Sequence, residues 1–231
     1  MSASRLRRAA CFLFVASALS ARLATPAQER PAWPDTLVAR LEALALLQTL
    51  NADILASRSA TLSLERWCRD HRLAEEPTIR ARVLNVSGRA ATAEQRVRLQ
   101  VSDREAVMYR RVQLRCGDRV LSEAENWYVP GRLTADMNRL LETTDTPFGK
   151  AVESLVPYRQ TFAVRILWSP LPDGWEQDSS RLPAATGGVL AMPDAIFEHR
   201  AILYTREHQP FSEVDEVYTR QILAFPPPSA R

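Results

Sequence analysis

The stretch AVMYRRVQLRCGDRVLSEAENWYV, residues 106–129, decides the fold. Two runs with apolar residues at alternate positions flank the short segment Gly117-Asp118-Arg119, which is the pattern of a β-hairpin closed by a glycine-containing turn. In the first run, residues 110, 112 and 114 share one face of the strand, and residues 109, 111 and 113 share the other. The stretch therefore predicts two antiparallel strands, at 106–115 and 120–129.

Strands and helices alternate outward from this hairpin. Alternating apolar residues indicate four more strands, at 78–84, 161–168, 196–205 and 211–223. Helical spacing indicates helices at 37–55, 63–71 and 133–141 and a short one at 92–99, with Ser63 as the N-cap of the second. Because hairpins or helix-containing loops join the strands, we expect an α+β domain with a six-stranded antiparallel sheet and helices packed on it. Prolines and glycines between residues 169 and 193 indicate a long surface connection.

The ends of the chain differ from its centre. Arg5, Arg7 and Arg8 precede an apolar stretch over residues 9–19, and small residues follow, which is the order of a secretory signal peptide. The apolar stretch is shorter than the roughly 20 residues that a membrane span needs. We predict a signal peptide at 1–27, an exposed linker at 28–36, a single domain at 37–223 and a proline-rich tail at 224–231. The protein is then periplasmic or secreted if the leader is cleaved, with the cytoplasm as the alternative.

The net charge of +3 belongs to the leader. Cleavage after Ala21 removes three arginines and no acidic residue, so the remaining chain has a formal charge of zero. Without a basic excess, nucleic-acid binding loses its compositional support. We therefore expect a monomer with no nucleic-acid partner and no stable membrane span.

Cysteines and histidines give little support to a metal centre. Cys68 and Cys116 are too few for a paired-cysteine metal site. They could form a disulfide outside the cytoplasm, but two small buried thiols are the favoured interpretation. His71, His199 and His208 are scattered along the chain, and we expect structural or surface roles for them. No metal and no organic cofactor is predicted.

Two charged residues inside predicted strands, Arg111 and Glu216, are the strongest candidates for a site. Burying an ionised side chain is costly unless a partner charge or a polar ligand meets it. By alternation Arg111 lies opposite the main apolar row, whereas Glu216 shares a face with Val214. A cross-strand salt bridge from Glu216 to Arg200 or Arg111 explains the pattern equally well. The polar segment 57–61 could offer free amides to an anion, or could simply connect two helices.

Several short motifs follow one another in a specific order. They are Arg111-x4-Cys116-x-Asp118, Tyr128-Val129-Pro130, Thr146-Pro147-Phe148-Gly149, Arg200, and Gln209-Pro210-Phe211 leading to Glu216. In this order and spacing the chain resembles bacterial chorismate lyase from about residue 46 to residue 223. The resemblance implies a chorismate-lyase-like fold and a lyase of ubiquinone biosynthesis that eliminates pyruvate from chorismate, or a related cyclic carboxylate, to give 4-hydroxybenzoate without a cofactor.

The resemblance also implies roles for individual residues. Arg111 would grip the ring carboxylate, since a guanidinium binds a carboxylate bidentately, and Glu216 would meet the ring hydroxyl as acid or hydrogen-bond partner. Because chorismate is a cytoplasmic metabolite and the leader indicates export, the alternative is a non-catalytic exported binding protein for a small aromatic carboxylate. The substrate-binding positions that the resemblance implies are Ala60, Phe148, Gly149 and Arg200.

Overall fold

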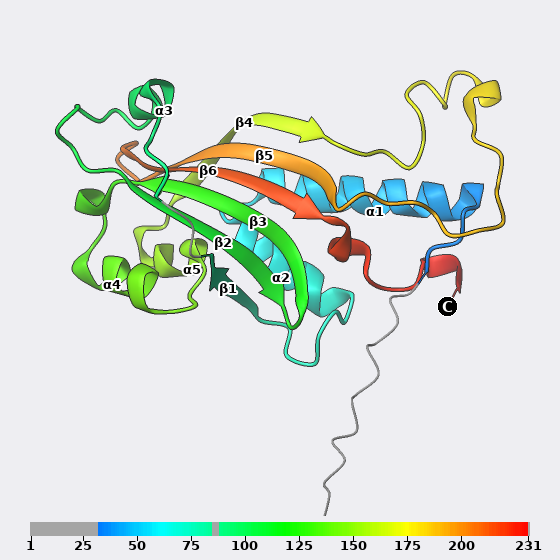
Figure 1. Ribbon diagram of the computed structural model, residues 1–231, viewed down its shortest axis with the longest axis horizontal. Helices are drawn as coiled ribbons and strands as arrows, with labels where there is room; N and C mark the ends of the chain where they lie inside the picture. The colour runs from blue at the N-terminus through cyan, green and yellow to red at the C-terminus, as the bar shows by residue number, and fades with distance from the viewer. Residues whose placement is uncertain (1–31, 85–87, 231) are drawn as a thin grey trace, which may run out of the picture.

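The computed structural model describes residues 32–84 and 88–230, so the predicted signal peptide lies outside the described residues. The described chain contains a six-stranded antiparallel sheet in the order β1-β2-β3-β6-β5-β4. Helices α1 and α2 lie behind this sheet in Figure 1 and cover one of its faces, which we call the inner face. The predicted α+β fold is confirmed.

The strands lie within a few residues of their predicted positions, but the last one ends at Thr219, and the predicted strand residues 220–223 form a 3-10 turn instead. Hairpins join β2 to β3 and β5 to β6, and β3 pairs with β6 at the centre of the sheet. Along β2, residues 110, 112, 114 and 116 are buried on the inner face, while 109, 111, 113 and 115 are half-buried on the outer face. The strand bounds are β1 (Ile79–Val83), β2 (Met108–Cys116), β3 (Arg119–Tyr128), β4 (Tyr158–Ile166), β5 (Ala195–Tyr204) and β6 (Pro210–Thr219).

The helices occur near the predicted positions, with one N-cap misplaced. The prediction that Ser63 caps the second helix is wrong: the N-cap is Ser59, and Ser63 is fully buried within the helix. The backbone turns helical four residues earlier because Ala60 and Thr61 pack inward and Ser63 N donates to Ser59 O at 3.3 Å. The bounds are α1 (Leu37–Ala56), α2 (Ala60–Asp70), α3 (Ala93–Arg98), α4 (Ala135–Thr143) and α5 (Phe148–Ala151), with 3-10 turns η1 (Pro130–Arg132), η2 (Glu153–Leu155), η3 (Ser179–Arg181), η4 (Arg220–Leu223) and η5 (Pro228–Ala230).

The core extends beyond the predicted domain limits at both ends. Trp33 is 3% exposed, its indole donates to Leu223 O at 2.9 Å, and its ring meets Phe225 edge-on. The predicted exposed linker and tail are therefore corrected for Trp33 and Phe225, which are part of the core. Large aromatic side chains stabilise a core through the apolar area that they bury, even where the segments that carry them are rich in proline.

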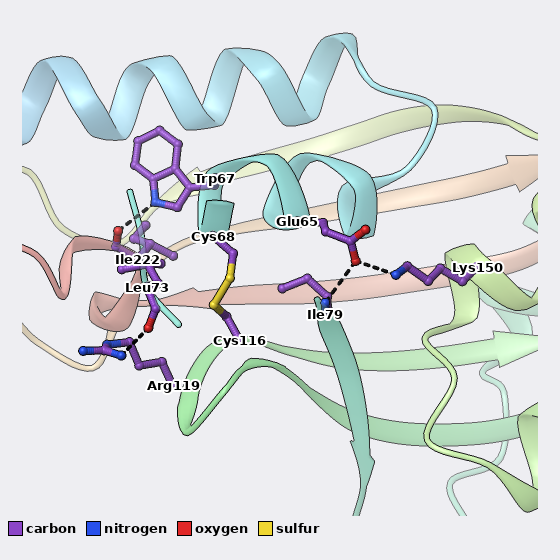
Figure 2. Close-up of a disulfide and its surroundings, with 9 residues drawn as sticks. All are labelled: Glu65, Trp67, Cys68, Leu73, Ile79, Cys116, Arg119, Lys150 and Ile222. Atoms are coloured by element: carbon purple, nitrogen blue, oxygen red, sulfur yellow. Dashed lines mark hydrogen bonds and ion pairs between the residues drawn. A yellow bond between two sulfur atoms is a disulfide. The ribbon is translucent and has the colours of Figure 1, made fainter. Parts of the chain in front are cut away.

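A disulfide joins Cys68 in α2 to Cys116 at the end of β2 (Figure 2). Both cysteines are fully buried, and their Cα atoms are 6.2 Å apart. The prediction of two buried free thiols is wrong because α2 packs across the inner face and brings two apolar positions within bridging distance. No helix within residues 32–84 and 88–230 is both long and apolar enough to cross a membrane.

Candidate functional site

A cavity of about 40 Å³ lies on the inner face of the sheet, beneath the first residues of α2 and α5. It is large enough for a few water molecules or a small polar group. We call the residues that close it, Arg58–Thr61 and Phe148–Gly149, the lid segments. The sheet contributes the remaining lining residues, which are Val112, Leu114, Ala124, Asn126, Arg159, Leu203, Val214 and Glu216.

An ion pair between Arg159 and Glu216 forms one wall of the cavity. Arg159 Nη2 lies 2.7 Å from Glu216 Oε2, and the two side chains are only 2% and 7% exposed. The Tyr218 hydroxyl donates to the same carboxylate oxygen at 2.9 Å, and burial raises the pKa of this hydroxyl, so it remains protonated. Glu216 accepts in both contacts and holds the Arg159 guanidinium against the cavity. Arg159 Nε and Nη1 have no hydrogen-bond partner among the described residues.

A second guanidinium, that of Arg110, is buried, and no carboxylate pairs with it within residues 32–84 and 88–230. Its Nη2 donates to Thr146 O at 3.1 Å, while Nε and Nη1 find no partner in the described part of the chain. Burial lowers the pKa of this arginine. Arg110 pairs in register with Asn126, whose Nδ2 also lacks a partner within the described ranges and which lines the cavity. Unused donors are therefore concentrated on and beside the cavity wall.

The N-terminal end of α2 adds a favourable dipole at the lid. Ser59 caps the helix without a side-chain hydrogen bond, and its Oγ is buried with no partner among residues 32–84 and 88–230. The positive end of an eleven-residue helix thus faces the cavity lining. Gly149 makes the close approach of α5 feasible, since a Cβ there would lie 2.5 Å from Ser59 Oγ and 3.1 Å from Thr61 Oγ1.

The charges around the cavity leave a positive excess. The Arg159–Glu216 pair is neutral as a unit, whereas Arg110 beside the cavity and the exposed Arg58 on its wall carry further positive charge. A buried cation is strongly destabilising unless an anion approaches it. A small anion with several acceptor oxygens would satisfy the unused donors and the charge together.

The structure brings four of the predicted site residues to one place and separates the other two from them. Ala60, Phe148, Gly149 and Glu216 all line the inner cavity. Arg111 lies on the outer face, where its Nη2 is 3.1 Å from Glu123 Oε2.

The expectation that Arg111 and Glu216 form two ends of one pocket is therefore corrected. Residues on opposite pleats of a strand face opposite sides of the sheet, and Glu216 lies on the inner one. Arg200 also faces outward, with its Nε 3.6 Å from Asp215 Oδ2. The predicted bridge from Glu216 to Arg200 or Arg111 is replaced by one to Arg159.

The outer face carries a wider groove of about 550 Å³, but its charges are already paired. Arg89 bridges to Glu125 at 3.1 Å, and Arg111 bridges to Glu123. The Tyr109 hydroxyl donates to Glu125 as well, and burial together with this carboxylate raises the pKa of Tyr109 to about 12. The unused donors of the inner cavity make it the stronger candidate site.

Sequence reasoning missed Arg159, Asn126 and Arg110. The predicted strand at 161–168 begins three residues after β4, so Arg159 was left outside it. For Arg110 the signal was present in the sequence, because Arg110 alternates with Val112 on the apolar side of its strand. A charged residue on the apolar face indicates a site more strongly than one on the opposite face.

No family model matches the chain. "Uncharacterized protein y4mC" of Sinorhizobium fredii is 46% identical over 231 residues, covering 98% of this chain and 97% of that protein. PhnF from Mycobacterium smegmatis has 13% identity and a TM-score of 0.46 over 74% of this chain and 68% of its own.

Two further solved structures resemble the chain at lower scores. The ligand-binding domain of a putative GntR-family transcriptional regulator from Bordetella bronchiseptica has 17% identity and a TM-score of 0.39 over 61% of this chain and 82% of its own. The possible transcriptional regulator YydK from Bacillus subtilis has 16% identity and a TM-score of 0.36, and this chain spans 58% of its length.

The expectation of a chorismate lyase is corrected. YydK is described as a possible transcriptional regulator and the Bordetella bronchiseptica structure as the ligand-binding domain of a putative one, and neither description names a lyase. In the molecule itself, Arg111 and Glu216 do not share a pocket. The identity and coverage of the Sinorhizobium fredii relative show that the chain belongs to the same family as the uncharacterized protein y4mC.

Proposed function

We propose that this protein binds a small organic carboxylate in the inner cavity and does not transform it. The observation that carries the proposal is the set of buried donors on the cavity wall without partners among the described residues: Arg159 Nε and Nη1, Asn126 Nδ2 and Ser59 Oγ. A buried donor left unsatisfied costs about 1–3 kcal/mol. An anion that accepts from several of these donors would offset that cost and gain affinity from it.

A carboxylate fits these donors for reasons of geometry and charge. Its two oxygens offer about four acceptor sites, and a guanidinium meets both oxygens in a planar fork. The positive end of α2 and the guanidinium of Arg110 beside Asn126 favour a negative ligand further. Phosphate shares this acceptor chemistry and is the comparison that the test must include.

Aromatic side chains in and near the lid segments support a ligand that carries an aromatic ring. The Phe148 ring lies 5.5 Å from Tyr128 and 6.4 Å from Phe211, measured between centroids, and Phe148 lines the cavity. A cavity of about 40 Å³ accommodates a carboxylate group, so a ligand ring requires displacement of Phe148. A ring in that place would stack on the remaining aromatic side chains.

The titratable groups near the cavity favour binding over catalysis. Glu216 already accepts from Arg159 and Tyr218. Burial, and then the charge of Arg159, lower the pKa of His199 to about 4, and its Nε2 contacts Asn51 Oδ1 at 2.7 Å. Both side chains are thus already engaged by protein groups, which supports binding rather than proton transfer to a ligand.

We also propose that the protein functions in an oxidising compartment. The buried Cys68–Cys116 bond supports this, because structural disulfides persist outside the reducing cytosol. A fusion of residues 1–30 to a reporter that is active only after export tests it. An active reporter supports export, whereas an inactive reporter with cytosolic accumulation contradicts it.

A thermal-unfolding series tests the binding proposal. We expect benzoate at about a hundred times its Kd to raise the unfolding temperature by about 5–10 °C, from the roughly 2.7 kcal/mol that such occupancy contributes. Acetate should raise the unfolding temperature less than benzoate does. Phosphate is included because it distinguishes binding of any small anion from recognition of a carboxylate. A stronger effect of phosphate than of benzoate would contradict the carboxylate class.

Matched variants locate the effect within the molecule. Asn126→Leu removes a cavity donor, and we expect it to reduce the benzoate-induced shift, as does Arg110→Met on the same row. Arg111→Met changes the adjacent residue on the outer face and should leave the shift intact. If Arg111→Met were the one variant that lost the shift, the ligand would lie on the outer face of the sheet, which would contradict the proposal.

A further inference from the structure

We propose that Glu65 and Lys150 form a latch that holds the two lid segments together and sets the rate of ligand exchange. The inference rests on the proposed binding function, and it assigns the control of access to two residues outside the cavity lining. Glu65 lies in α2 and Lys150 in α5, and Figure 2 shows their side chains meeting between these elements.

The contacts of Glu65 make it a junction of three elements. Its Oε2 accepts from Lys150 Nζ and, at 3.0 Å, from the backbone N of Ile79 at the start of β1. Lys150 follows Gly149 directly, and Gly149 is the residue packed against Ser59 and Thr61 over the cavity. Separation of Lys150 from Glu65 therefore releases the part of α5 that closes the cavity.

The two lid segments are not equally anchored. Cys68 in the last turn of α2 is bonded to β2, and Trp67 Nε1 donates to Ile222 O at 2.8 Å. Both attachments are visible in Figure 2, at the end of α2 away from Lys150. Because the disulfide fixes α2 to the sheet, opening of the cavity falls to the four-residue helix α5.

The latch is built to open without disturbing the core. The Glu65 and Lys150 side chains are 27% and 28% exposed, so water competes for both charges. Glu65 keeps its contact with Ile79 N when Lys150 leaves, so neither the carboxylate nor the amide is orphaned. The neighbouring pair Arg66–Asp53 connects α2 to α1 at 2.8 Å and involves no residue of α5, which makes it the matched control.

The chain offers a direct reporter, because Lys150 is its only lysine. We expect acetic anhydride to acylate Lys150 about fivefold faster in Glu65→Gln than in the wild-type protein, the factor that corresponds to an exposed ion pair of about 1 kcal/mol. Peptide mass spectrometry separates Lys150 from the N-terminal amine. Asp53→Asn should leave the rate unchanged, and equal rates in wild type and Glu65→Gln would overturn the latch.

Stopped-flow binding of benzoate connects the latch to the ligand. In Lys150→Met we expect the association and dissociation rates to rise together by about fivefold, with Kd changed less than about twofold. Unaltered rates, or a change in only one of the two rates with a matching change in Kd, would overturn gating by this pair. If benzoate binds neither the wild-type protein nor any variant, the proposed function fails. The difference in acylation rate between wild type and Glu65→Gln still decides whether the latch holds α5.

Discussion

Arg110 and Arg111 are consecutive residues of β2 that lie in different environments. Arg110 is 6% exposed and donates one hydrogen bond, to a backbone carbonyl. Arg111 lies on the outer face, is 38% exposed, and pairs with Glu123. A buried guanidinium that lacks a counter-ion among the described residues is a cost to the fold, and the proposed anion would offset this cost.

Substitution of Arg110 by methionine should therefore stabilise the protein when no anion is present. We expect Arg110→Met to raise the free energy of unfolding by about 1–2 kcal/mol, because a side chain of similar length fills the space without an unpaired charge. Urea denaturation in an anion-poor buffer measures this. Arg111→Met should change the free energy by less than about 0.5 kcal/mol, and a clear loss of stability in Arg110→Met would show that its charge is already satisfied.

The Arg159–Glu216 pair should behave in the opposite way. Arg159→Leu leaves a buried carboxylate without its partner, and we expect a loss of about 3–5 kcal/mol. The double variant Arg159→Leu with Glu216→Leu removes both charges and should recover most of that loss. A double-mutant cycle from urea denaturation measures the coupling, and a double variant as unstable as the single one would contradict a paired role.

Alternation predicted which residues share a face but not which face holds the site. The sequence pattern already placed Arg110 in the row of Val112 and Leu114, and the structure bears this out. The order of the motifs, however, favoured Arg111 as the site residue, and Arg111 is one residue away on the opposite face. A shift of one position along a strand moves the side chain to the other face of the sheet. A short motif that locates a site to within one residue therefore does not identify the residue that faces the site.

At the scale of elements, the disulfide attaches α2 to the sheet. Cys68 and Cys116 are separated by 48 residues, and closing a loop of that length contributes about 4 kcal/mol in the chain-entropy account. We expect the double variant Cys68→Ser with Cys116→Ser to lose about this amount in urea denaturation. Retention of full stability, or an unaltered unfolding midpoint of the wild-type protein under reducing conditions, would contradict the bond.

The elements that were predicted well can be recognised from a local run of residues. The helix at 37–55 corresponds to α1, which buries Ala39, Ala43, Leu47 and Leu50 at helical spacing. The errors occur where tertiary packing decides: Ser63, the predicted cap, is buried inside α2, and the disulfide depends on how α2 crosses the sheet. Neither is encoded in a local pattern.

For the whole molecule, the buried His199 and the half-buried Asp215 give opposing dependences of stability on pH. Burial and the charge of Arg159 lower the pKa of His199 from 6.5 to about 4, so between these values only the unfolded chain binds the proton. Stability from His199 therefore falls as the pH decreases through this window. Burial raises the pKa of Asp215 from 3.8 to about 6, so the native state holds the extra proton and stability falls as the pH increases through that range.

Single variants should separate these two effects. With Asp215→Asn, stability should rise by about 3 kcal/mol from pH 4 to pH 6.5, following His199 alone. With His199→Gln, stability should fall by about 1–2 kcal/mol from pH 4 to pH 6, the smaller value reflecting the partial exposure of Asp215. The wild-type profile should lie between them. Stability is measured by urea denaturation at each pH. If the stability of both variants changed with pH in the same direction, the burial assigned to one of the two groups would be wrong.

A crystal structure of the protein with benzoate tests the central claim most directly. We expect the benzoate carboxylate in the inner cavity, with an oxygen about 3 Å from the unused nitrogens of Arg159 or from Asn126 Nδ2, and the ring in place of the displaced Phe148. Benzoate bound in the outer groove beside Arg111, with the inner cavity unchanged, would contradict the claim.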